Sequence, residues 1–112
     1  MANNNDIYRT GVIGQFNLTF ELAWKALQAV LKEHGVQEAQ TGSPREIVQL
    51  GYKFGFIEDS AVWIIMLKSR NTATHIYNES EIIELLLLIR DSFIHAFEIL
   101  EKTLQKKYQE TL

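Results

Sequence analysis

The chain has 112 residues, of which 46% are apolar and 22% charged, with one proline and no cysteine. This composition is typical of one globular domain over residues 1–112 and excludes disordered and low-complexity proteins. The lack of cysteine excludes thiolate zinc sites, thiol nucleophiles and disulfides, and it favours the reducing cytoplasm as the compartment. The net charge of −3 excludes the broad cationic surface that binds long nucleic acids, so any contact with RNA must be local.

The sequence contains no segment that is apolar over the length of a membrane. The longest apolar run, from Ile82 to Ile89, is interrupted by one glutamate and is far shorter than the roughly 20 residues of a spanning helix. Residues 1–6 are polar and lack the apolar region of a signal peptide, so we expect them to fray. We therefore predict a protein with no membrane contact.

The first predicted helix runs from about Thr10 to His34, and Gly35 provides the residue that tolerates a left-handed stop. Its large apolar residues recur at steps of three and four, which is the period of one helical face. They are Ile13, Phe16, Phe20, Trp24, Leu27 and Leu31, and the face is expected to be widened by Leu18, Leu22, Ala26 and Val30. We interpret the aromatic residues of this face as packing residues.

The second and third predicted helices are marked by their first residues. Residues 43–46 read Ser-Pro-Arg-Glu, a capping box with proline at the first helical position, and the helix that begins there should end near Phe54. Asp59 or Ser60 can cap a third helix, which should continue to about His75. Both helices therefore follow from local sequence signals.

The fourth predicted helix follows Asn78 as its cap and runs from about Glu79 to Gln109. It begins with acidic and ends with basic residues, which suits the helix dipole. Between Ile82 and Ile89 it is apolar almost all round, which predicts that part of this surface contacts another chain. Because no strand-like alternation is long enough to matter, we predict an all-α bundle.

The polar segment from Lys68 to Tyr77 contains residue types that can cleave a phosphodiester. Arg70, Asn71, His75 and Tyr77 offer a phosphate-binding cation, an amide, a group that titrates near pH 6.5 and a phenol. Metal-free cleavage of RNA needs a base for the 2′-hydroxyl, an acid for the leaving oxygen and a cation for the phosphorane. From the residues alone, a polar helix end without a catalytic role is nevertheless the favoured interpretation.

The spacing of Arg70 and His75 bears on how they could act together. On a straight helix they lie roughly 140° apart, whereas Asn71 and His75 are neighbours at i,i+4. Either the last helical turn unwinds, or two copies of the segment face each other across a two-fold axis and combine their Arg and His groups. We favour the second arrangement and therefore predict a homodimer.

Two other pairs of residues compete for a functional role. Arg90 and His95 have the same spacing in the middle of the last helix, but Arg90 can pair with neighbouring acids and no phenol follows, so we assign this copy to structure. Glu21 and Lys25 have the spacing of a solvated i,i+4 ion pair. The weaker alternative is that Glu21 supports the site by orienting Arg70.

Three segments in this order and spacing, Phe16–Lys25, Ser43–Glu46 and Arg70–Tyr77, resemble the nucleotidyltransferase substrate-binding protein family, a branch of the HEPN helical domains. The resemblance covers about residues 7–104. It implies an up-and-down bundle of four or five helices that dimerises and works beside a separately encoded minimal nucleotidyltransferase, commonly as a toxin and antitoxin pair. Relatives usually carry a further helical stretch before residue 7, and this departure predicts that the chain relies on a partner for stability.

The resemblance also implies roles for individual residues. The HEPN ribonuclease motif, an Arg followed four to six residues later by a His, matches Arg70 and His75, and Asn71 occupies the polar position after the Arg. A Tyr that the partner modifies with AMP in related pairs matches Tyr77. The implied activity is metal-independent endoribonuclease cleavage with no cofactor. The complete motif favours this activity, whereas the acidic charge balance favours a non-catalytic subunit that presents substrate to the nucleotidyltransferase, and a third interpretation is a dimerisation module without a ligand.

Overall fold

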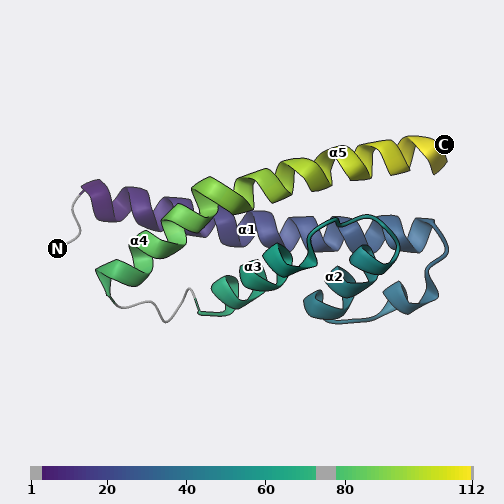
Figure 1. Ribbon diagram of the computed structural model, residues 1–112, viewed down its shortest axis with the longest axis horizontal. Helices are drawn as coiled ribbons and strands as arrows, with labels where there is room; N and C mark the ends of the chain where they lie inside the picture. Colours follow the sequence, from purple (N-terminus) through teal and green to yellow (C-terminus); the bar gives the residue numbers. More distant parts are fainter. Residues whose placement is uncertain (1–3, 73–77, 112) are drawn as a thin grey trace.

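A computed structural model describes residues 4–72 and 78–111 and shows an elongated helical bundle, 51 × 23 × 20 Å in extent. The two longest helices, α1 (Asn4–Glu33) and α5 (Ile94–Thr111), lie side by side and run in the same direction (Figure 1). The helix α4 (Glu79–Leu88) leads into α5 through one π-helical turn, Ile89–Phe93. No strand occurs in the described ranges, and the predicted all-α fold is confirmed.

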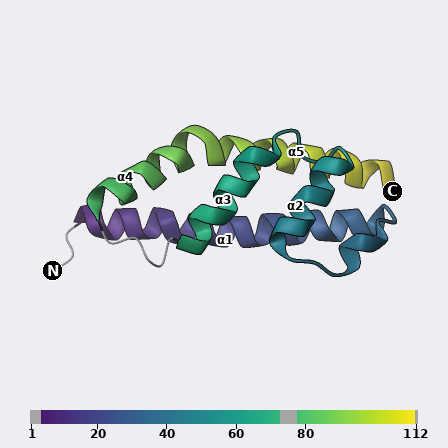
Figure 2. The ribbon, with the colours of Figure 1, turned by 60° about the horizontal axis from the view of Figure 1, so that its bottom comes forward.

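Two shorter helices pack on one side of this long pair. They are α2 (Pro44–Lys53) and α3 (Ser60–Thr72), and a short 3-10 helix, Gln37–Gln40, connects α1 to α2. Figure 2 shows α3 crossing from the α4–α5 helix to α1, running back toward the beginning of α1. This direction brings the last turn of α3 against the middle of α1.

The ends of α1 and α2 follow the capping chemistry that the sequence predicts. Gly35 has a φ of +82°, and the backbone N–H of Val36 donates to the carbonyl of Leu31 at 3.0 Å, which is a Schellman ending. At the start of α2, the backbone N–H of Glu46 donates to the hydroxyl of Ser43 at 3.2 Å, and the Glu46 carboxylate accepts from the Ser43 backbone. The capping box is confirmed.

Side-chain caps also begin α3 and α4. The carboxylate of Asp59 accepts hydrogen bonds from the backbone N–H groups of Ala61 and Val62, at 3.1 and 3.4 Å, so Asp59 caps α3. The side-chain oxygen of Asn78 accepts from the backbone N–H of Glu81 at 2.8 Å, as predicted for α4. The structure describes α3 as far as Thr72, and the rest of the predicted helix, to His75, lies outside the described residues.

The core between α1, α3 and α5 contains aromatic rings that pack against one another. Phe16 stacks on Phe93 with ring centroids 5.1 Å apart, and Trp63 meets Phe97 edge-on at 5.6 Å. Phe20 lies 6.2 Å from Trp63 and is completely buried. Because these contacts hold α3 against α1, they fix the place where the last turn of α3 meets the middle of α1.

The predicted start of the first helix, near Thr10, is wrong, because α1 already begins at Asn4. The periodic apolar residues mark only the part of a helix that packs against the core. A helix that has already formed can extend beyond this part, because each added residue gains one backbone hydrogen bond whether or not its side chain is apolar. Ile7 and Tyr8 are accordingly helical but 64% and 71% exposed. An ion pair of 3.0 Å between Arg9 and Glu79 attaches this part of α1 to the beginning of α4.

The prediction of one regular helix from Glu79 to Gln109 misses the π-helical turn. The backbone N–H of Ile94 donates to the carbonyl of Ile89, five residues earlier. Three buried residues of this region, Leu85, Ile89 and Phe93, follow one another at steps of four, which drift around the axis of a helix with 3.6 residues per turn. The wider turn keeps these side chains facing the core.

The predicted widening of the apolar face of α1 is also wrong for Leu18, Leu22 and Ala26, which are exposed. The exposed fractions of the two leucines are 53% and 61%. They lie on a side of α1 that α2 and α3 do not cover. On α4, Ile83 and Leu87 remain exposed while Leu85 is buried, so apolar surface is left over on this helix. No helix within residues 4–72 and 78–111 is long and apolar enough to cross a membrane.

Candidate functional site

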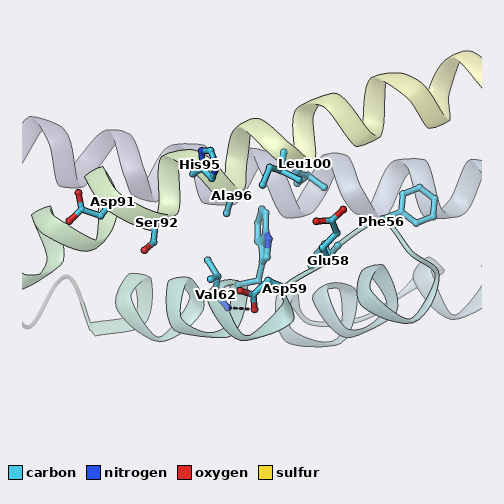
Figure 3. Close-up of a pocket in the computed structure, with 12 residues that line it drawn as sticks. Phe56, Glu58, Asp59, Val62, Asp91, Ser92, His95, Ala96 and Leu100 are labelled. Atoms are coloured by element: carbon cyan, nitrogen blue, oxygen red, sulfur yellow. Dashed lines mark hydrogen bonds between the residues drawn. The ribbon is translucent and has the colours of Figure 1, made fainter.

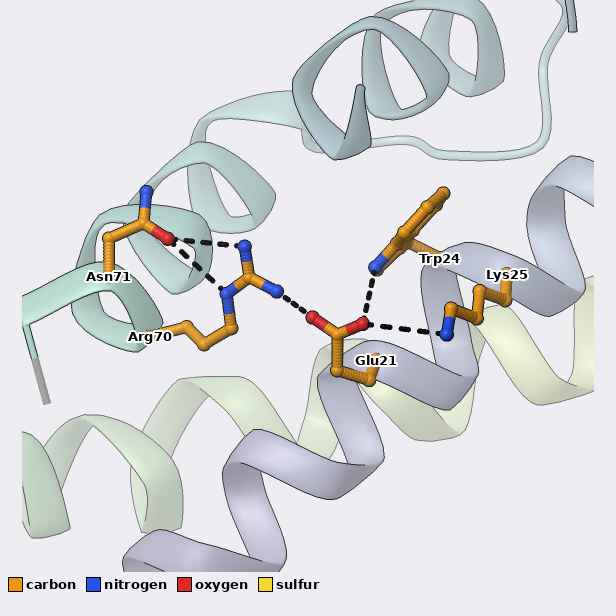
Figure 4. A network of polar contacts seen from close by, with 5 residues as sticks. All are labelled: Glu21, Trp24, Lys25, Arg70 and Asn71. Atoms are coloured by element: carbon orange, nitrogen blue, oxygen red, sulfur yellow. Dashed lines mark hydrogen bonds and ion pairs between the residues drawn. The ribbon is translucent and has the colours of Figure 1, made fainter. Parts of the chain in front are cut away.

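The centre of the candidate site is an ion pair between Glu21 on α1 and Arg70 in the last turn of α3 (Figure 4). The carboxylate oxygen Oε1 of Glu21 contacts Nη1 of Arg70. Its other oxygen, Oε2, accepts a hydrogen bond of 3.3 Å from the indole N–H of Trp24 and lies 3.9 Å from Nζ of Lys25. Glu21 therefore links two neighbours on its own helix to a residue far away in the sequence.

Two further contacts hold the Arg70 side chain. Nε and Nη2 of Arg70 donate to the amide oxygen of Asn71, at 3.3 and 3.1 Å. The guanidinium carbon lies 5.4 Å from the centroid of the Phe20 ring, a cation–π distance. With an exposed side-chain fraction of 25%, Arg70 is partly buried and held in one orientation.

This arrangement leaves Arg70 able to bind an anion. Three of its N–H groups are used by Glu21 and Asn71, and a guanidinium carries five, so two remain without a partner in the described part of the chain. Arg70 and Lys25 provide two positive charges against the one carboxylate of Glu21. The cluster keeps a local positive charge although the whole chain is acidic.

The structure brings together three of the residues that the sequence analysis singled out, Glu21, Arg70 and Asn71. The two others, His75 and Tyr77, lie outside the described residues. The last described turn of α3 ends at Thr72, whose hydroxyl donates to the carbonyl of Lys68 at 3.0 Å. Arg70 and Asn71 thus lie at the point where the chain leaves α3 toward the two undescribed candidates.

Sequence reasoning assigned Phe20 and Trp24 to packing alone. Both pack, but the Phe20 ring also lies against the guanidinium of Arg70, and the Trp24 indole N–H binds the carboxylate of Glu21. The signal for this contact was the i,i+3 spacing of Glu21 and Trp24, which places a partly buried aromatic donor beside a carboxylate. The expected contact of Glu21 with Lys25 is present, although it is longer than the contact with Trp24.

The second Arg and His pair has different surroundings. Arg90 is bound to Asp91 by two hydrogen bonds of 2.7 and 3.2 Å, and Nδ1 of His95 lies 3.9 Å from the Glu98 carboxylate. The hydrogen bond from Arg90 holds the pKa of Asp91 below its ordinary value, and Asp91 raises the pKa of Arg90. Both side chains of the Arg90–Asp91 pair are mostly exposed.

A cavity of about 250 Å³ lies beside this second pair, between the start of α3 and α5 (Figure 3). Trp63 and Leu100 form part of its apolar lining, while three carboxylates, those of Glu58, Asp59 and Asp91, supply most of its polar lining. Because these acids repel phosphate, the cavity does not suit RNA. The charge of the cavity is consistent with a structural rather than a catalytic role for Arg90 and His95.

Within the described ranges, no group of three or more His, Cys, Asp or Glu side chains is placed to hold a metal ion. The described side chains at the Arg70 cluster supply a positioned guanidinium, an amide and a carboxylate. Such a set can bind a phosphate and stabilise charge that develops on it.

Comparison with known proteins supports the family suggested by the sequence. The model of the family described as "Nucleotidyltransferase substrate binding protein like" matches residues 1–106. The chain is similar to the "Probable ribonuclease HepT" of Haemophilus influenzae (strain ATCC 51907 / DSM 11121 / KW20 / Rd), with 24% identity over 103 residues, which cover 90% of this chain and 70% of that protein. No solved structure matches the chain. Because the family model spans nearly all of the sequence, the chain belongs to the nucleotidyltransferase substrate binding protein like family.

Proposed function

We propose that this chain is the HEPN component of a nucleotidyltransferase/HEPN pair and that its homodimer is a metal-independent ribonuclease toxin of the cytoplasm. The observation that supports it most is the fixed orientation of Arg70, which Glu21, Asn71 and Phe20 hold while two N–H groups remain for a phosphate. The family and the similarity to a protein named as a probable ribonuclease support the same class.

In the proposed reaction, His75 takes the proton of an RNA 2′-hydroxyl, and the 2′-oxygen attacks the adjacent phosphorus. The bond to the 5′-oxygen breaks, this oxygen receives the proton that His75 took, and a 2′,3′-cyclic phosphate is left. Arg70 stabilises the negative charge of the phosphorane, and Asn71 holds the phosphate or His75. Glu21 acts as a positioning residue through its ion pair with Arg70.

We infer that the site is composite, because Arg70 and His75 diverge by roughly 140° on a straight helix. A two-fold axis would let Arg70 of one copy act with His75 of the partner subunit. The exposed side chains Ile83 and Leu87 on α4 are apolar surface that a second copy can cover. The proposed dimer uses this surface.

We also propose that the partner nucleotidyltransferase transfers AMP from ATP to the phenol oxygen of Tyr77, with release of pyrophosphate. The free pKa of a phenol is near 10, so the partner must supply a base or a metal ion that removes its proton. The modification would place a bulky anion two residues from His75. This anion would repel RNA phosphate and switch the toxin off.

The second candidate function is a non-catalytic subunit that presents substrate to the nucleotidyltransferase. Its support is the description of the family, the net charge of −3 and the fact that Arg70 is already paired with a carboxylate. Cleavage of RNA by the purified chain separates the two candidates. The ribonuclease function requires this cleavage, and the substrate-presenting function does not include it.

The experiment incubates purified dimer with a mixed RNA in EDTA and follows cleavage on denaturing gels. Wild type should cut, and His75→Ala should lose about 100-fold or more in rate. After treatment with the partner, ATP and magnesium, intact mass should show one added AMP on each chain, and cleavage should stop. Tyr77→Phe should stay unmodified and active. If wild type and His75→Ala are equally inactive, the substrate-presenting function is the correct one.

A further inference from the structure

A continuous groove lies between α1 and α5, away from the Arg70 cluster. It consists of two adjoining cavities of about 320 and 270 Å³, which share Thr19, Phe97 and Glu101 in their linings. On α1 the groove extends from Val12 to Ala26, a distance of about 21 Å at 1.5 Å per residue. This is the length of a helix of about four turns.

The groove lies on a side of α1 that the described helices α2 and α3 leave open. Those two helices cover other residues of α1: a Cβ on Gly51 of α2 would approach the Leu27 side chain to 2.8 Å, and Trp63 of α3 packs on Phe20. Leu22 lines the groove from α1 and is 61% exposed, and Ile94 lines it from α5 and is 47% exposed. Leu22 and Ile94 therefore form opposite edges of one groove.

The charges along the groove are acidic on the α5 side. Glu98 and Glu101 both line it, and both are exposed. Glu98 lies 3.9 Å from His95, and Glu101 forms no ion pair with any described residue. The groove thus combines an apolar floor, which includes Phe16 and Phe97, with a rim of two carboxylates on one side.

We propose that this groove binds an amphipathic helix of a different protein, with an apolar stripe for the floor and Lys or Arg residues that face Glu98 and Glu101. Two parallel helices with an open seam accept a third helix by packing of ridges into grooves. A second copy of this chain is disfavoured as the occupant. A two-fold axis across the groove would bring the acidic rims of both copies together, and like charges repel. An axis along the groove would place each rim against α1 of the other copy, whose described groove residues include no Lys or Arg to pair with the carboxylates.

The proposal does not depend on ribonuclease activity, because neither Glu21 nor Arg70, the described centre of the candidate site, lines the groove. It also differs from the proposed dimer surface on α4, which contains Ile83 and Leu87. The groove, the ribonuclease activity and the dimer can therefore be tested independently of one another.

The test uses two labelled helical peptides of about 14 residues with the same leucine stripe, one flanked by lysines and one by glutamates. Fluorescence anisotropy measures their binding to the full chain. We expect the lysine peptide to bind wild type and to bind Glu98→Lys/Glu101→Lys at least tenfold more weakly. The glutamate peptide should show the reverse preference.

The matched control is Glu38→Lys/Glu84→Lys, which changes the net charge equally at exposed positions outside the groove. Its affinity for the lysine peptide should stay within about twofold of wild type, and circular dichroism should show that both variants are folded. Equal binding of the two peptides, or an equal loss in both double variants, would overturn the proposal. The proposal would also be overturned if Leu22→Asp dissociated a wild-type dimer and the lysine peptide did not bind. A second copy of the chain would then be the occupant of the groove.

Discussion

The carboxylate of Glu21, in the middle of α1, holds the guanidinium of Arg70 at the end of α3. The indole N–H of Trp24 in turn donates to the second oxygen of that carboxylate at 3.3 Å. A long arginine side chain loses considerable conformational freedom when it is fixed in this way, and the core contacts of α1 with α3 are what make the fixation stable. The orientation of Arg70 is therefore a product of the fold rather than of its own helix.

Glu21→Gln should lower the rate of RNA cleavage about tenfold, because Arg70 loses the charged partner that orients it. The RNA affinity should not fall, since the substitution removes a negative charge from the site. Steady-state kinetics should therefore show a lower kcat with an unchanged or lower KM. Lys25→Ala is the control, because its ammonium is mostly exposed and 3.9 Å from Glu21, and its kcat should stay within about twofold of wild type. Equal kcat values in the two variants would exclude a positioning role for Glu21.

Ser43→Ala should reduce the free energy of unfolding by about 1 kcal/mol, because the Ser43 hydroxyl accepts the hydrogen bond of the Glu46 backbone at the start of α2. Urea unfolding followed by circular dichroism measures the loss. Ser69→Ala, with no cap to lose, should change the same quantity by less than about 0.5 kcal/mol. A similar loss in both variants would show that the capping box contributes nothing specific.

The lowered pKa of Asp91 gives a prediction with a defined sign. The hydrogen bond from Arg90 favours the charged carboxylate in the folded chain, so its stabilising effect is present at neutral pH and disappears as the pH falls through the pKa of the folded state. Arg90→Ala should raise the pKa of Asp91 toward its ordinary value near 3.9. An NMR titration of the Asp91 carboxyl carbon measures this shift, and an unchanged pKa would mean that the pair does not persist in solution.

The proposed dimer should depend on the apolar surface of α4. The mass in solution at micromolar concentration should be that of a dimer for wild type, and Ile83→Glu/Leu87→Glu should weaken association at least tenfold, because it places charge on a buried contact. Tyr52→Glu/Phe54→Glu adds the same charge at exposed apolar residues of another surface and should leave the mass unchanged. A wild-type monomer would remove the argument for a site shared between copies.

The sequence predicts the parts of this molecule that depend on neighbouring residues. The Ser43 capping box, the Asn78 cap and the glycine stop at Gly35 are local, and each is present as expected. The contact between Glu21 and Arg70 could only be offered as an alternative, because it depends on how α3 crosses α1.

Tertiary packing also decided what the sequence pattern missed. The exposure of Leu22 arises because α2 and α3 cover only one side of α1, which a helical period does not specify. The π-helical turn at Ile89 arises because core residues four apart must all face inward. Such features are set by the partners of a helix rather than by its own residues.

The ribonuclease proposal is decided by the rate of RNA cleavage in EDTA. This rate is measured for wild type, Arg70→Ala and Arg90→Ala, each as a folded dimer, across the titration range of histidine. We expect a wild-type rate that rises with pH around 6.5, a loss of about 100-fold or more in Arg70→Ala and a rate close to wild type in Arg90→Ala. A wild-type dimer that cleaves no RNA, or an Arg70→Ala dimer that cleaves as fast as wild type, would contradict the proposal.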